Sequence, residues 1–191
     1  SSVRQNANGV SNVSWTFRKQ AKFFDIVSYT GTNAAQTISH NLGCQPGAII
    51  IKDTSNTSNW YVAVRDGTSG SNFTYTAFSY NAGLNLTAAA SVTGIGYQSL
   101  GYITSTGFAI NSLNATNTVN DPNNYNDTGK TYIAYLFASN AGGFGSAGTD
   151  NVITCGSFTT DGSGLATVSL GYEPQWVLSK YSSSGGAWYL M

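Results

Sequence analysis

Few side chains in this sequence could carry acid, base or nucleophilic chemistry. His40 is the single histidine, so a Ser-His-Asp triad would depend on it, and no serine sits in a G-x-S-x-G turn. A glycosidase needs two carboxylates facing each other across a cleft, and Asp66 with Asp121 or Asp127 is the pair that such an enzyme would use. We favour a turn histidine hydrogen-bonded to backbone at His40, and we expect no enzymatic activity.

The loop around Asp121 and Asp127 is the one segment whose composition could hold a metal. Its asparagines add oxygen donors of the kind that Ca²⁺ prefers, and they are Asn123, Asn124 and Asn126. The spacing does not match an EF-hand, so we favour a solvated loop of Asx turns. We expect no cofactor.

Aromatic residues near polar loops are the candidates for ligand binding. A tyrosine ring beside amide and hydroxyl groups can stack on a neutral sugar. The candidates for glycan binding are Tyr75, Tyr80, Tyr97, Tyr125 and Tyr181. For each of them the alternative is an ordinary strand aromatic that packs in the fold.

The charge balance excludes two classes of partner. Only 8% of the 191 residues are charged, and the formal net charge is zero. Nucleic-acid binding needs clustered Lys and Arg to displace counterions from phosphates, so we expect none. No run of 18 apolar residues exists, so we expect no membrane insertion. The one basic cluster, Arg18 to Lys22, is either a solvated connector or a contact with a neighbouring subunit.

Two cysteines, Cys44 and Cys155, form no C-x-x-C motif and no metal-ligand spacing. Their spacing is compatible with one disulfide or none. We favour two small, buried apolar side chains.

An internal repeat organises the chain. The segment Leu42–Lys52 matches Leu170–Lys180 at an offset of 128 residues, and a Trp-Tyr pair follows each lysine at the same distance. Thr37-Ile38-Ser39 and Tyr29-Thr30 also have counterparts, in Thr167-Val168-Ser169 and Phe158-Thr159. The repeated structural positions are Gly43, Pro46, Trp60, Gly171, Pro174 and Trp188. Glycine and proline at these places predict a bend before a strand.

Short apolar runs between polar turns predict an all-β fold. In the first copy the predicted strands are Phe24–Thr30, Gln36–His40, Ala48–Lys52 and Trp60–Val64, and in the second copy Val152–Thr159, Ala166–Leu170, Trp176–Lys180 and Trp188–Met191. Further strands are predicted at Phe73–Tyr80, Gly101–Ile103, Gly107–Ile110 and Lys130–Ala138. We expect Ala48–Lys52 to be buried on both faces. The pattern favours a β-sandwich with jelly-roll-like connections.

Three units follow from this organisation. Residues 1–22 form an N-terminal connector, and residues 23–149 form a β-sandwich that includes the first copy at about 23–64. Residues 150–191 form the second copy, packed in the same or an adjoining sandwich. Because the second copy stops within a predicted strand, we expect either that the biological polypeptide continues beyond Met191 or that another chain covers this edge.

One set of motifs runs along nearly the whole chain, about residues 15–191. They are Trp15-Thr16-Phe17-Arg18-Lys19, Phe23–Gly31, Thr37–Gly43, Pro46 with Ile49–Lys52, Asn59-Trp60, Tyr132–Ala138, Gly156-Ser157-Phe158 and Gly171-Tyr172-x-Pro174. In this order they resemble the duplicated β-rich domain of tail-fibre and virion-associated proteins of tailed phages, marine and cyanobacterial ones included. Two departures stand out. Lys52 and Lys180 are followed by Asp53 and Tyr181, where that family often carries more basic residues, and the second copy is unusually poor in charge.

The resemblance implies a structural or adhesive role in the virion tail, after assembly in the host cytoplasm. It implies other virion subunits as partners, a homotrimer by analogy with fibres, and attachment to a host surface glycan. It carries over no catalytic residue. The alternatives are a tail-associated carbohydrate-active enzyme (a depolymerase) and a secreted bacterial adhesin.

Overall fold

The computed structural model describes residues 16–57, 60–64, 82–83, 100–110, 125–181 and 188–191, together with Gly9, Ser11 and Ser14. This part of the chain contains ten strands and no helix. Every pairing between strands is antiparallel. The all-β prediction is therefore confirmed.

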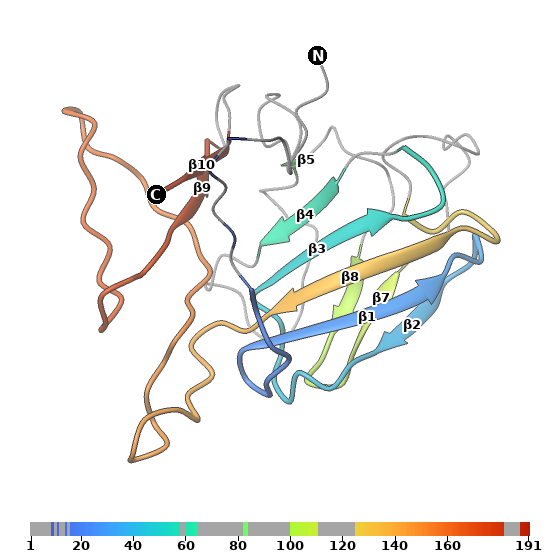
Figure 1. The fold of residues 1–191 in the computed structure, drawn as a ribbon, viewed down its shortest axis with the longest axis horizontal. Helices are drawn as coiled ribbons and strands as arrows, with labels where there is room; N and C mark the ends of the chain where they lie inside the picture. Colours follow the sequence, from blue (N-terminus) through green and yellow to red (C-terminus); the bar gives the residue numbers. More distant parts are fainter. Residues whose placement is uncertain are drawn as a thin grey trace.

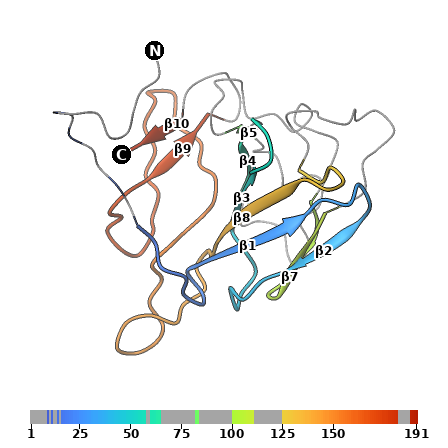
Figure 2. The ribbon, with the colours of Figure 1, turned by 45° about the vertical axis from the view of Figure 1, so that its right-hand side comes forward.

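The strands form three sheets (Figure 1). The largest has the order β1 (Phe24–Thr30), β8 (Thr131–Phe137), β3 (Ala48–Asp53), β4 (Trp60–Val64) and β5 (Ala82–Gly83). The second has the order β2 (Gln36–Ser39), β7 (Gly107–Ile110) and β6 (Leu100–Ile103). The third is the hairpin of β9 (Leu178–Lys180) and β10 (Trp188–Leu190), which lies to one side of the other two (Figures 1 and 2).

Strand β8 joins the two halves of the largest sheet. It pairs with β1 along one edge, from Phe24 opposite Phe137 to Thr30 opposite Thr131, and with β3 along the other. Its side chains alternate, with Tyr132, Ala134 and Leu136 buried and the odd-numbered residues more exposed. This alternation is that of a strand with one face on a core.

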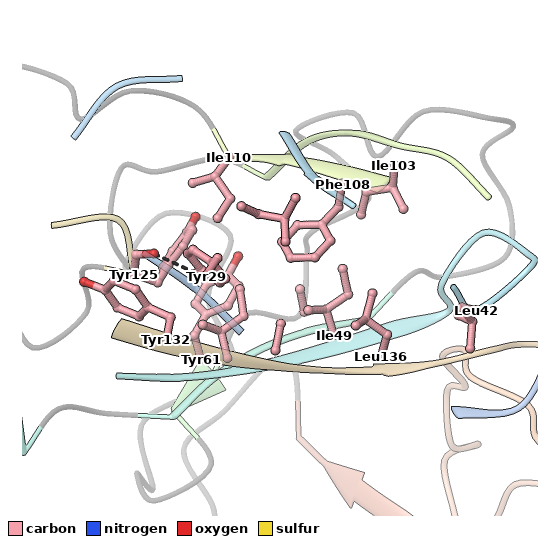
Figure 3. Close-up of a cluster of buried hydrophobic side chains, with 14 of the residues drawn as sticks. Tyr29, Leu42, Ile49, Tyr61, Ile103, Phe108, Ile110, Tyr125, Tyr132 and Leu136 are labelled. Carbon is pink, nitrogen blue, oxygen red and sulfur yellow. Dashed lines mark hydrogen bonds between the residues drawn. The ribbon is translucent and has the colours of Figure 1, made fainter. Parts of the chain in front are cut away.

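The core lies between the two larger sheets (Figure 3). The five-stranded sheet contributes buried side chains that include Ile49, Tyr61 and Leu136. The three-stranded sheet contributes Phe108 and Ile110, which point toward them. Both sheets thus contribute to one apolar cluster, whereas the β-sandwich, its jelly-roll connectivity and the duplication stay predictions.

Most predicted strands of the first copy and of residues 100–138 have the expected positions, with ends that differ by at most one or two residues. One expectation for β3 is wrong: Ile49 and Ile51 are buried, but Ala48, Ile50 and Lys52 are only half-buried. The strand faces the core on one side only. The predicted strand Phe73–Tyr80 lies outside the described residues.

Two strands predicted in the second copy are wrong, because Val152–Thr159 and Ala166–Leu170 are irregular. Their counterparts β1 and β2 pair with β8 and β7, which come from residues 107–137 rather than from the copy itself. A strand needs a paired neighbour to satisfy its backbone groups. Only the hairpin, whose two strands pair locally, forms in both copies.

The two bends of the repeat have the same backbone geometry. Gly43 has a φ of +71° and Gly171 a φ of +79°, in the left-handed region that side chains resist. The hairpins that follow also share a register: Lys52 lies opposite Trp60 in the first, and Lys180 opposite Trp188 in the second. The repeated sequence therefore gives the same local structure twice.

A buried polar segment closes one end of the core. The Asn126 side-chain oxygen accepts hydrogen bonds from the Thr32 amide (3.1 Å) and from Gln36 Nε2 (2.6 Å), and its nitrogen donates to the Ala34 carbonyl (2.9 Å). Each buried polar atom of this side chain is thereby satisfied. The segment holds the β1–β2 connection against the core.

Gly31, in that connection, has no room for a side chain. A Cβ added there would lie 2.2 Å from the Asp127 carbonyl oxygen, whereas one added at Gly156 would meet nothing within 4 Å. We expect Gly31→Ala to lower the free energy of unfolding by about 2 kcal/mol, because backbone must move. Gly156→Ala, the control, should change it by less than about 0.5 kcal/mol. Urea unfolding of both variants measures this, and equal stabilities would contradict the packing described.

Candidate functional site

The outer edge of β1 is closed by its own neighbours. Lys19 forms an ion pair with Asp25 (Nζ to Oδ1, 3.0 Å) and also donates to the Ile26 carbonyl. The Ile26 amide donates to Asp25 Oδ1 (2.9 Å), and Phe24 exchanges backbone hydrogen bonds with Gln20 (2.9 and 3.0 Å). Exposed sheet edges recruit other strands unless they are blocked. These contacts oppose strand addition at this edge.

One residue of the basic cluster, Lys19, therefore has an identified structural role. Lys19 covers the start of β1, and Asp25 Oδ2 accepts from the Asn41 amide at 2.8 Å. Burial raises the pKa of the Asp25 carboxyl, but the hydrogen bonds from Asn41, Lys19 and Ile26 outweigh it and hold that pKa below its usual value of 3.8. The carboxylate is a structural anion at neutral pH.

His40 is a structural histidine, as the sequence favours. Its side chain is buried, Nδ1 accepts a hydrogen bond from the Leu42 amide (3.2 Å), and its own amide donates to the Thr106 carbonyl (2.9 Å). Burial lowers the pKa of the imidazole below 6.5, against the opposing effects of the Thr104 carbonyl and Asp25. The ring is neutral in the folded protein at pH 7.

Of the three carboxylates in the metal and enzyme hypotheses, the structure describes one, Asp127. Asp127 is buried next to the Tyr132 hydroxyl, which accepts a hydrogen bond from the Asp127 amide at 3.0 Å. Asp66 and Asp121 lie outside the described residues. Within the described ranges, no group of three or more His, Cys, Asp or Glu side chains could hold a metal ion. The solvated loop expected at Asp127 is wrong, because the buried Asn126 side chain anchors this segment under the β1–β2 connection.

The glycan candidates divide into three groups. Tyr125 belongs to the core at 2% exposure, with its ring centroid 4.5 Å from that of Tyr61, so the glycan interpretation is wrong for it. Tyr181 is exposed and meets Tyr189 edge to face at 6.1 Å. The remaining candidates lie outside the described residues, and they are Tyr75, Tyr80 and Tyr97.

A row of aromatic rings lies on the outer face of the largest sheet, and it contains none of the tyrosines that the sequence suggested for glycan binding. Trp60 stacks on Tyr135 (ring centroids 6.1 Å apart), and Tyr135 stacks on Phe24 (6.5 Å). Phe17 extends the row by contacts with Phe24 (5.6 Å) and Trp176 (5.8 Å). The ring faces are engaged with one another, so this aromatic row is suited to packing against apolar groups rather than to stacking on a sugar.

The alternation of side chains between the two faces of a strand explains why the sequence did not predict this aromatic row. Duplication favours a core position for both members of the Trp60-Tyr61 pair. Neighbouring residues of a strand point to opposite faces, and only Tyr61 belongs to the core, whereas Trp60 is half-buried on the other face. The two-residue period of β4 and β8 is the signal that locates this row.

The C-terminal segment is the most exposed apolar part of the described chain. Among the described residues, all the large hydrophobic side chains that are exposed lie in residues 152–191. The segment is tied to the sheets at a few points: the Cys155 amide donates to Ser139 Oγ (3.0 Å), and the Asn140 amide to the Ile153 carbonyl (3.0 Å). These exposed apolar side chains are open to contact with another surface.

Both cysteines are half-buried thiols. Cys44 packs against the core, and Cys155 Sγ donates to the Ala138 carbonyl at 3.4 Å. They act as small apolar side chains with local contacts.

In the part of the chain that the structure describes, no helix is long and apolar enough to cross a membrane.

Acid should destabilise the fold through His40. Because its folded pKa lies below the unfolded value of 6.5, the unfolded chain takes up the proton first as the pH falls, and stability is lost below about pH 6.5. We expect the free energy of unfolding to fall between pH 7 and pH 5, by at most about 1.4 kcal/mol per pH unit. His40→Asn keeps an acceptor for the Leu42 amide and should flatten this slope. Equal slopes in urea titrations of the two proteins would contradict this account.

Comparison with known proteins places the chain in a family without assigning a function. No curated protein and no solved structure matches it. A family does match, over residues 2–191, nearly the whole sequence. The chain belongs to the family described as Domain of unknown function (DUF7483).

Proposed function

We propose that this domain is a structural and adhesive component of a phage tail fibre or adsorption apparatus, which contributes to virion assembly and to attachment at the host surface. The observation that carries the proposal is the concentration of exposed apolar side chains in residues 152–191. Several exposed large apolar side chains in one segment favour contact with another protein over contact with water. The motif order that resembles phage tail proteins adds the virion context.

The proposed partners contact different residues of the C-terminal segment. Other virion subunits contact the exposed C-terminal segment, and a homotrimer is the assembly proposed by analogy with fibres. A host surface glycan contacts polar loops, where Tyr181 is the accessible tyrosine among the described candidates. The proposed location is the tail of the virion, after assembly in the host cytoplasm.

The low charge of the chain supports this role. Only 8% of its residues are charged, and the buried carboxylates Asp25 and Asp53 accept hydrogen bonds from backbone amides of their own surroundings. These hydrogen bonds stabilise turns and strand ends. The proposed role is non-enzymatic.

Immunogold electron microscopy tests the virion role. Antibodies raised against the purified chain should label the tail fibres of phage particles whose genome encodes it. Particles of an unrelated tailed phage provide the control. Absence of label from intact and from detergent-opened particles would overturn the proposal.

A pull-down on host cells tests the adhesive part. The purified chain should bind cells that carry surface polysaccharide and lose that binding on cells stripped of it. Tyr181→Ala should weaken binding about tenfold, the loss of one sugar-stacking ring. Phe158→Ala, at 57% exposure against 55% for Tyr181, is the matched control and should bind like the unmodified chain. Equal binding to stripped cells would exclude a glycan receptor.

A further inference from the structure

Phe17, which precedes the first strand, packs against both the largest sheet and the C-terminal segment. Its ring centroid lies 5.6 Å from that of Phe24 in β1 and 6.1 Å from that of Phe137 in β8. The centroid of the Trp176 ring lies 5.8 Å from it. Phe17 and Trp176 are both half-buried. One aromatic side chain therefore joins two parts of the molecule that are far apart in the sequence.

Trp176 is a departure from the sequence repeat. At the offset of 128 residues it stands where the first copy has Ala48. Ala48 belongs to the outer face of β3, because the residues that alternate with it are the buried ones. An indole ring offers far more apolar surface to a neighbour than a methyl group does. The exchange gives the C-terminal segment a ring that packs against Phe17.

The position of Trp176 is tied to that of the C-terminal hairpin. The next residue, Val177, exchanges two backbone hydrogen bonds with Met191 (2.8 and 3.0 Å), beside the paired strands β9 and β10. Before Trp176, the Tyr172 hydroxyl is hydrogen-bonded to Thr154 Oγ1 at 2.9 Å. A two-stranded hairpin is only marginally stable by itself in water, so packing at Trp176 contributes to the stability of this hairpin.

Phe17 is also tied to the residues that close the outer edge of β1. Lys19 forms its ion pair with Asp25, and Gln20 exchanges backbone hydrogen bonds with Phe24 (2.9 and 3.0 Å). The Phe17 ring packs on the ring of Phe24 itself. The closed state of this edge therefore depends on where the Phe17 ring is held.

We propose that Phe17 couples the closed edge of β1 to the docked C-terminal hairpin, so that each is more stable when the other is in place. The contact between Phe17 and Trp176 favours the state in which both elements are packed, and a coupling free energy of this kind is reciprocal. Release of the hairpin loosens the closed edge, and opening of the edge loosens the hairpin. The coupling is independent of the virion role, because it involves contacts within one chain.

Hydrogen exchange of the full chain measures the coupling in both directions. In Phe17→Ala, the amides of Val177 and Met191 should exchange about three- to tenfold faster, because loss of an aromatic contact favours local opening by about that factor. In Trp176→Ala, the amides of Gln20 and Phe24 should exchange faster by a similar factor. All four amides donate to backbone carbonyls in the folded protein.

A double variant and a control distinguish coupling from independent effects. Both single changes remove the same contact, so at Gln20 and Phe24 the double variant should exchange within about twofold of Phe17→Ala alone. Phe158→Ala removes a ring from the same C-terminal segment that is 57% exposed. This control should leave the exchange of Gln20 and Phe24 unchanged.

Slow exchange of Thr131–Phe137 shows that each variant is folded. If Phe17→Ala also loosens β8, the result for Trp176→Ala decides, because Trp176 lies outside the two larger sheets. Unchanged exchange at Gln20 and Phe24 in Trp176→Ala would overturn the proposal, as would unchanged exchange of the hairpin amides in a folded Phe17→Ala. Single effects that multiply in the double variant, or an equal acceleration in Phe158→Ala, would overturn it as well.

Discussion

Antiparallel pairing along both edges of β8 is the interaction on which the rest of the structure depends. This strand connects β1 to β3, and its inward side chains Tyr132, Ala134 and Leu136 meet the side chains of β7 across the core. The segment before it, with Tyr125 and Asn126, closes the end of that core. Because β8 comes about 80 residues after β3, the fold is assembled by non-local contacts.

The second copy illustrates the same dependence by contrast. Its sequence resembles the first copy closely enough to give the left-handed glycine, the bend and the hairpin register again. The segments that correspond to β1 and β2 are irregular, and their apolar side chains Val152, Phe158 and Val168 are exposed. Local sequence therefore determines turns and hairpins, whereas the other strands require a partner from elsewhere in the chain.

The sequence predicts elements well where the signal is local. Strands β1 and β4 begin and end where the apolar runs do, and His40 is the backbone-bonded turn residue that its position indicates. The sequence does not predict features that depend on residues far apart along the chain. The burial of Tyr125 requires Tyr61 from β4, and the part played by Lys19 requires the edge of β1. Neither contact can be inferred from the spacing of residues in the sequence.

Hydrogen exchange of the unmodified chain, resolved by peptide, tests the central place of β8 most directly. The amides of Thr131–Phe137 should exchange slowest, and β1 and β3 should lose protection together with them, because all three open in one cooperative step. Residues 157–170 should exchange faster by several orders of magnitude. Protection of residues 157–170 equal to that of β8, or loss of protection in β8 before β1 and β3, would contradict the account.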